Sequence, residues 1–329
     1  MRRRKFLGVL GGALAACPLA ARAQQHDRVA RVGVLGPSRE KNPISRLGYA
    51  TFLAELRKLG FADGQNLQVE FGRTDEDMAG AFAAANEMMA HKADVLVANG
   101  PEVTLQAAAA ARPQVPIVML ATNFDPFARG YVKNLADPGG NITGIFYRQP
   151  ELAAKQLELL AEAFPERKRI GTLWDIQSAE QANRAEAAAQ SMGLSLRSLK
   201  LENPPYDFDA AFQALARDDA QMLQVLSSPN FTEHGALIAA LAIRYRLPSM
   251  FIFKHYVEVG GLMSYSVDTS HMWRRAASYV AKILRGARTI DLPIERAENF
   301  LFTVNLKTAK AIGVTLPTSI LLRADEVIE

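Results

Sequence analysis

The residue patterns of common hydrolytic and transfer enzymes are absent from this sequence. It contains no G-x-S-x-G elbow, no G-x-x-x-x-G-K-[ST] phosphate loop, and no G-x-G-x-x-G after an apolar run. A zinc-binding helix needs two histidines four residues apart with an acid between them, and no pair here has that spacing. The histidines are His26, His91, His234, His255 and His271. The sequence therefore predicts neither an enzyme nor a metal or cofactor site.

Polar and aromatic residues instead gather in the loops that follow apolar runs. Ligands bind at the carboxyl ends of the strands in parallel α/β sheets, so these loops contain the candidate ligand-binding residues. Each polar one is also an ordinary choice for a helix N-cap, and both interpretations stay open. The candidates are Ser38, Asn99, Glu102 and Asp125 in the first half, and Trp174, Asp175, Asn230 and Tyr265 in the second half.

The elements that position these loops alternate between apolar runs and amphipathic stretches. Strands are predicted in the first half at 29–36, 66–71, 93–100 and 115–120, with helices between them. The alternation restarts after 137–145, with strands at 169–175, 194–200, 222–228, 247–253 and 260–266. The pattern predicts an α/β protein with two similar lobes, each built on a parallel, doubly wound sheet.

The first 23 residues have the composition of an export signal. Arg2, Arg3, Arg4 and Lys5 precede an apolar run that ends near Ala21, and "RRKFLG" is similar to a twin-arginine signal. Two processing sites compete in "LAACPLAARAQQ". Lipidation would occur at Cys17, whereas cleavage after Ala23 would release a protein that begins at Gln24. We expect cleavage after Ala23 and a periplasmic location.

The charge balance excludes a nucleic-acid surface once this leader is set aside. The leader holds five of the 38 basic residues and no acidic residue, which leaves 33 basic against 34 acidic residues and a net charge of −1. Cys17 is the single cysteine, so the remaining chain forms no disulfide. About 300 residues of balanced charge predict two domains, and nothing indicates nucleic acid as a partner.

Several segments resemble the ABC-transporter substrate-binding family that includes tryptophan and tyrosine binders. The likeness covers nearly all of the chain after the leader, and its more specific pieces are "PGGNITG" and "GGLMSY". The other segments are "LIAALAIRYRLPSMFIF", "RRAASYVAKILRG" and "FTVNLKTAKAIGVTLPTSILLRADEVIE". The resemblance implies a type I periplasmic binding protein: two Rossmann-like lobes joined by three crossovers, without catalysis.

The resemblance also sets the expected boundaries and partners. Lobe 1 comprises residues 24–146 plus about 268–290, and lobe 2 comprises 147–267 plus about 291–329. The partners are a small-molecule ligand, amino-acid-like or aromatic, and an ABC permease with its ATPase. The binding protein itself is expected to be a monomer. A periplasmic α/β enzyme and a ligand sensor for a signalling receptor are the alternative functions.

Specific roles follow for the candidates. Asp125 and Asn230 are expected to face one another across the cleft and touch the ligand, and Tyr265 either stacks on the ligand or packs in the hinge. Glu102 and Asp175 depart from the family pattern and would favour a cationic or uncharged ligand, unless Glu102 points into solvent.

Overall fold

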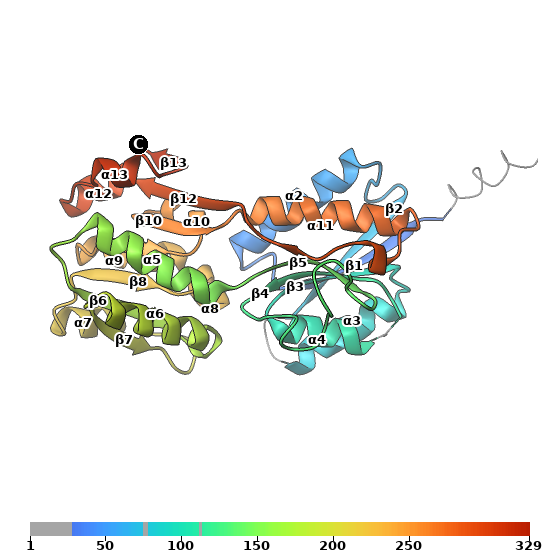
Figure 1. Cartoon of the computed structure of the whole chain (residues 1–329), viewed down its shortest axis with the longest axis horizontal. Helices are drawn as coiled ribbons and strands as arrows, with labels where there is room; N and C mark the ends of the chain where they lie inside the picture. Colours follow the sequence, from blue (N-terminus) through green and yellow to red (C-terminus); the bar gives the residue numbers. More distant parts are fainter. Residues whose placement is uncertain (1–27, 75–77, 112–113) are drawn as a thin grey trace, which may run out of the picture.

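The computed structural model describes residues 28–74, 78–111 and 114–329, which form two α/β lobes (Figure 1). The strands of the first sheet are β1 (Ala30–Gly36), β2 (Leu67–Arg73), β3 (Val95–Gly100), β4 (Ile117–Thr122), β5 (Ile142–Tyr147) and β11 (Glu295–Arg296). Those of the second sheet are β6 (Arg169–Trp174), β7 (Ser195–Lys200), β8 (Met222–Val225), β9 (Ser249–Phe251), β10 (Met263–Val267), β12 (Phe300–Asn305) and β13 (Glu326–Ile328).

Helices connect these strands and cover the sheets. They are α2 (Pro43–Lys58), α3 (Met78–Ala90), α4 (Glu102–Ala111), α5 (Gln149–Ala163), α6 (Ala179–Ser191), α7 (Phe208–Arg217), α8 (Pro229–Glu233), α9 (Gly235–Arg244), α10 (Lys254–Glu258), α11 (Thr269–Leu284), α12 (Leu306–Ile312) and α13 (Thr318–Leu321). Two short 3₁₀ helices are η1 (Ile176–Ser178) and η2 (Thr289–Asp291). No described helix is both long enough and apolar enough to span a bilayer.

Both sheets have the order of doubly wound folds. The first is β11-β5-β4-β3-β1-β2 and the second is β13-β12-β10-β9-β8-β6-β7. The pairs are parallel except β10 with β12, where Met263 lies opposite Val304 in antiparallel register. The predicted α/β class with two lobes is therefore confirmed, with this one departure from an all-parallel sheet.

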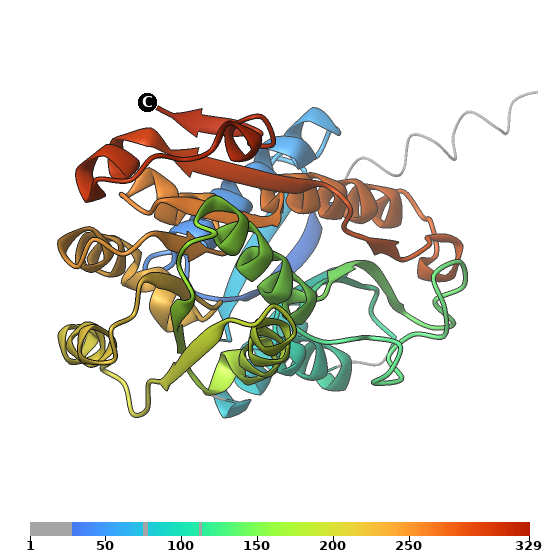
Figure 2. The same ribbon diagram turned by 60° about the vertical axis from the view of Figure 1, so that its left-hand side comes forward.

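The chain passes between the sheets three times. It leaves the first sheet after β5, returns after β10, and leaves again between β11 and β12. Helix α11 consequently belongs to the first lobe, where it packs against α2 (Figure 1). The C-terminal elements form the outer edge of the second lobe (Figure 2). Because β11 pairs with β5, the third passage follows residue 296, later than the boundary near 290 that the sequence indicates.

The "NITG" segment has a structural explanation at the start of β5. The buried Thr143 hydroxyl donates to the carbonyl oxygen of Leu292 over 2.8 Å, which attaches the returning chain to β5. Gly144 has a φ of +131°, and a Cβ there would lie 2.1 Å from the carbonyl oxygen of Met119 in β4. Only glycine fits this close approach of two neighbouring strands.

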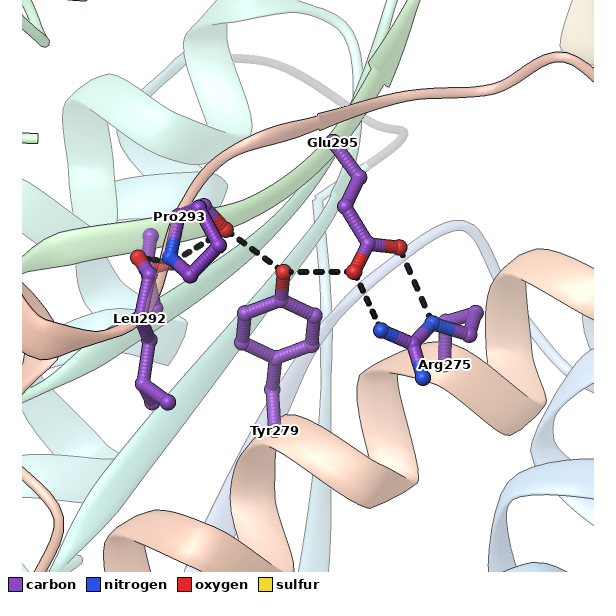
Figure 3. Close-up of polar contacts among 6 residues, drawn as sticks. Arg275, Tyr279, Leu292, Pro293 and Glu295 are labelled. Atoms are coloured by element: carbon purple, nitrogen blue, oxygen red, sulfur yellow. Dashed lines mark hydrogen bonds and ion pairs between the residues drawn. The ribbon is translucent and has the colours of Figure 1, made fainter. Parts of the chain in front are cut away.

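A polar cluster holds the last segment of the first lobe before the third passage (Figure 3). Arg275 of α11 donates two hydrogen bonds to the carboxylate of Glu295, one over 2.9 Å. The Tyr279 hydroxyl lies 2.9 Å from the same carboxylate and 2.5 Å from the carbonyl oxygen of Pro293. These hydrogen bonds, led by those of Arg275, hold the pKa of Glu295 below its ordinary value.

Replacing Glu295 by glutamine is expected to lower the free energy of unfolding by about 1 kcal/mol at pH 7. The loss stays small because roughly a third of each side chain is exposed and water screens the pair. A lowered carboxyl pKa stabilises the fold above the ordinary pKa, and this contribution disappears as the pH falls through the lowered value. Urea unfolding should therefore separate wild type from variant at pH 7 but much less at pH 3.

Glu298→Gln is the matched control, because Glu298 is an exposed carboxylate in the same connecting segment. It should leave the stability almost unchanged at both pH values. An equal loss for Glu295→Gln at pH 7 and pH 3 would show that the ion pair does not carry the effect.

Candidate functional site

A cleft lies between the lobes at the carboxyl ends of both sheets. The first lobe contributes residues that follow β1, β3 and β4, and the second lobe contributes residues that follow β8. The space between the lobes, counted to its open mouth, is about 820 Å³. The carboxyl ends of the strands are the position at which doubly wound sheets bind small molecules.

Aromatic side chains form one part of the cleft wall. The indole of Trp273 on α11 lines the cleft and packs edge-on against Tyr49 and Phe52 of α2, with ring centroids 5.1 and 5.7 Å away. Gly48 makes room for it, because a Cβ at that position would lie 2.0 Å from the indole nitrogen. Tyr147 and Phe253 add two more rings to the lining. Such walls suit a flat apolar ligand group.

Uncharged polar groups also line the cleft, and several of them are connected to one another by hydrogen bonds. The Gln149 amide donates to the hydroxyls of Tyr147 and Ser227, each over 3.0 Å. Burial raises the pKa of Tyr147, so its phenol stays neutral. Within the described ranges, no Asp, Glu, Lys, Arg or His lines the cleft. Recognition therefore relies on hydrogen bonds and backbone dipoles.

Helix N-termini of the first lobe open onto this cleft. Asn42 precedes α2, Gly100 and Pro101 precede α4, and Thr269 begins α11; all of them line the cleft. The helices are 16, 10 and 16 residues long. The side chains of Asn42 and Asp268 already accept hydrogen bonds from first-turn N–H groups of α2 and α11. The dipoles of the three helices still attract negative charge, so this side of the cleft favours an anionic group such as a carboxylate.

Of the first-lobe candidates, Asn99 lines the cleft and the other three do not. Ser38 is 1% exposed, and its hydroxyl donates to Glu40 over 2.9 Å. Glu102 lies 3.2 Å from the Arg129 guanidinium and accepts a hydrogen bond from Tyr131 over 3.1 Å. Its charge is neutralised within the first lobe rather than directed at a ligand.

Asp125 lies beside the cleft in a separate depression that it shares with Arg148. One carboxylate oxygen accepts hydrogen bonds from the backbone N–H groups of Phe127 and Ala128, over 2.9 and 3.1 Å. The other oxygen is 3.9 Å from the Arg148 guanidinium. These contacts are those of a cap for the following turn, which is the alternative that the sequence also allows.

The second-lobe candidates Trp174, Asn230 and Tyr265 also lie outside the cleft lining. Lys200 sits 5.7 Å from the ring centre of Trp174. The backbone carbonyl of Asn230 is 2.8 Å from the ring nitrogen of His234. Tyr265 stacks on Phe300 with centroids 5.6 Å apart and ring planes 9° apart, between the two strands that border the hinge. Neither Asp125 nor Asn230 lines the cleft across which they were expected to face one another.

Asp175 is completely buried behind the cleft rather than in its lining. Its carboxylate accepts a short hydrogen bond from the hydroxyl of Ser228, which does line the cleft. The backbone N–H of Gln177, another lining residue, donates to it over 3.1 Å. Asp175 is therefore connected to the cleft by its hydrogen bonds with the lining residues Ser228 and Gln177.

Sequence reasoning missed several cleft residues, above all Trp273, Tyr147 and Gln149. Trp273 belongs to an apolar stripe that also contains Ala276 and Ala277, which is indistinguishable from an ordinary core face. Its signal is indirect: a glycine at position 48 in the middle of α2 costs helix stability and indicates close packing. Tyr147 and Gln149 lie at the first passage between lobes, which no periodicity in the sequence marks.

The comparisons with known proteins agree with this geometry. The family model described as "ABC transporter substrate binding protein" matches residues 43–328. A tyrosine-binding protein of Clostridioides difficile (strain R20291) is 24% identical over 267 residues, which cover 80% of this chain and 75% of that relative.

Solved structures extend the likeness to the whole fold. An ABC domain from Streptococcus pneumonia in complex with L-Trp has a TM-score of 0.78 and 25% identity, covering 91% of this chain and 99% of that one. A conserved domain protein from Vibrio cholerae has a TM-score of 0.80 and 25% identity, over 91% and 100% of the two chains. A leucine-binding protein from Thermotoga maritima shares the fold alone, with 15% identity, a TM-score of 0.53 and coverage of 72% and 69%. The fold is that of type I periplasmic binding proteins, and the chain belongs to the ABC transporter substrate-binding protein family.

Proposed function

We propose that this protein is the extracytoplasmic receptor of an ABC importer and encloses an amino acid with a flat apolar side chain between its lobes. The observation that carries the proposal is the composition of the cleft. Helix N-termini of the first lobe suit a carboxylate, and the rings of Trp273, Tyr147 and Phe253 suit an aromatic body. The tyrosine-binding relative and the L-Trp complex support the same ligand class.

The position of Glu102 removes one objection to a carboxylate ligand. The sequence alone suggests that this residue would repel a carboxylate. It pairs with Arg129 and does not line the cleft, so this repulsion is not expected. The ligand-loaded protein would then deliver its cargo to a membrane permease that is driven by an ATPase. Genes for both beside this gene would favour transport over a sensing role.

We also propose export to the periplasm, with cleavage after Ala23 rather than lipidation of Cys17. The supporting pattern is the basic start, short apolar run and small-residue site of residues 1–23, which lie outside the described residues. Mass spectrometry of the exported protein should find Gln24 at its N-terminus. A diacylglyceryl group on Cys17 would contradict this part of the proposal.

Thermal unfolding with candidate ligands tests the binding function. At a ligand concentration a hundred times the dissociation constant, the free energy of unfolding should rise by about 2.7 kcal/mol. We expect L-tryptophan or L-tyrosine to raise the melting temperature, and glucose or adenosine to leave it unchanged. The stabilising compound should be recovered unaltered after incubation. Its conversion would indicate an enzyme instead, and a response to none of the amino acids would contradict the proposed ligand class.

A further inference from the structure

The buried carboxylate of Asp175 lies directly behind the second-lobe wall of the cleft. It is 0% exposed, yet within the part of the chain that the structure describes no Lys, Arg or His lies within ion-pair distance of it. Its partners are instead neutral donors: the hydroxyls of Ser228, Tyr206 and Ser178 and the backbone N–H of Gln177. A buried anion is normally balanced by a cation, because burial without one is costly.

The hydrogen bond to Asp175 fixes the direction of the Ser228 hydroxyl. The Ser228 hydroxyl donates to the Asp175 side chain, so its proton points at Asp175. Ser228 is a lining residue of the cleft, and a hydroxyl oxygen that donates one hydrogen bond can still accept another. A hydroxyl that donates to an anion is also a stronger acceptor, because neighbouring hydrogen bonds polarise each other. Ser228 therefore offers the ligand an acceptor rather than a donor.

Asn123 of the first lobe supplies a second hydrogen-bond acceptor. The side-chain nitrogen of Asn123 donates across the lobes to the carbonyl oxygen of Gln177 over 2.9 Å. The Asn123 side-chain oxygen is buried and has no hydrogen-bond partner among the described residues. Gln177 thus connects Asn123 to Asp175, and both Asn123 and Ser228 line the cleft.

We propose that Ser228 and Asn123 form the subsite for the ligand's ammonium group. Asp175 is the positioning residue, because its hydrogen bond orients the Ser228 hydroxyl as an acceptor for the ligand. This rests on the proposed amino-acid ligand. The ammonium would donate to the two acceptors and supply the positive charge that Asp175 lacks. The first lobe also offers helix N-termini for the carboxylate, so the site has groups that suit both charged groups of an amino acid.

The Asp175→Asn variant tests the polarity. An asparagine amide can donate to Ser228 and reverse its hydroxyl, which turns the acceptor in the cleft into a donor. The probes are L-tryptophan and L-tyrosine, each paired with its 2-hydroxy acid, in which a hydroxyl replaces the ammonium. By calorimetry we expect the variant to bind the better amino acid about 10- to 100-fold more weakly, as for lost hydrogen bonds to a charged group. The 2-hydroxy acid, whose hydroxyl can donate or accept, should change by less than about threefold.

Two further variants separate positioning from mere structure. Ser228→Ala keeps the buried carboxylate but removes the acceptor. It should lower the ratio of the affinity for the amino acid to the affinity for its 2-hydroxy acid. Combined with Asp175→Asn it should add little, because both act on one contact. Tyr206→Phe is the matched control: it removes another donor to Asp175, over 3.1 Å, from a residue that does not line the cleft. It should leave the ratio unchanged.

The outcomes are distinguishable from a failure of the proposed function. If the wild-type protein binds neither amino acid, the function and this inference fall together. If it binds one, and the folded Asp175→Asn protein loses affinity for that amino acid and for its 2-hydroxy acid by the same factor, the ammonium subsite alone is overturned. If Asp175→Asn does not fold, Ser228→Ala decides, and an unchanged ratio in that variant overturns the subsite.

Discussion

Replacing Gly144 by alanine is expected to lower the free energy of unfolding by about 3–5 kcal/mol, enough to unfold many proteins of ordinary stability. Gly144 has a left-handed φ, which costs a side chain energy at any site. An added Cβ would also lie 2.1 Å from the carbonyl oxygen and 2.6 Å from the nitrogen of Met119. Both are backbone atoms within the ladder between β4 and β5, so neither can move without breaking it.

Gly140→Ala provides the control four residues earlier. Gly140 has no atom within 4 Å of an added Cβ and no left-handed φ. Its replacement should change the stability by no more than about 0.5 kcal/mol. Urea unfolding of both variants measures the difference, and a Gly144→Ala protein of near wild-type stability would refute the close approach of these strands.

Replacing Trp273 by alanine is expected to lower both stability and ligand affinity. The side chain is 3% exposed and packs between Tyr49 and Phe52, so its loss should cost about 3–5 kcal/mol of unfolding free energy. The indole also lines the cleft, and the bound amino acid would lose an aromatic contact there. We expect affinity for L-tryptophan or L-tyrosine to fall about tenfold, measured by calorimetry at a temperature at which the variant is folded.

Phe52→Ala separates the two effects. Phe52 is fully buried and touches the same indole but does not line the cleft. Its replacement should cost a similar stability and leave the affinity closer to that of wild type. Equal loss of affinity in both variants would mean that Trp273 acts on binding only through the packing of α2 against α11.

The fold was accessible from the sequence because its strands are short, apolar and regularly spaced. The segment at 29–36 became β1, and the stripe through Trp273 and Ala276 became α11. The end of the chain was harder to interpret. The apolar run of β12 does not show that this strand is antiparallel to β10. The two residues of β11 are too few to produce a periodicity that predicts a strand. The helical stretch after β8 is interrupted at His234, between the end of α8 at Glu233 and the start of α9 at Gly235.

The cleft was less accessible, because a residue at the end of a strand can point along either side of its loop. Asn99 lines the cleft, whereas Ser38 turns its hydroxyl to Glu40 and the adjacent Pro37 lines it instead. Asp125 and Glu102 are candidates because they are charged loop residues. In the structure a backbone N–H group donates to Asp125, and Arg129 forms an ion pair with Glu102. Periodicity shows which residues follow a strand. It does not show which of them another lobe will face.

The third passage of the chain has a consequence for biosynthesis. Helix α11 completes the first lobe's wall of the cleft, yet its residues are made after the second-lobe strands β6 to β10. Until they emerge from the ribosome, α2 lacks the helix that covers Tyr49 and Phe52, and the nascent first lobe keeps an apolar face open to water. Folding of that lobe therefore cannot finish in the order of synthesis, and a chain released before residue 269 would lack Thr269, Met272 and Trp273 from the cleft lining.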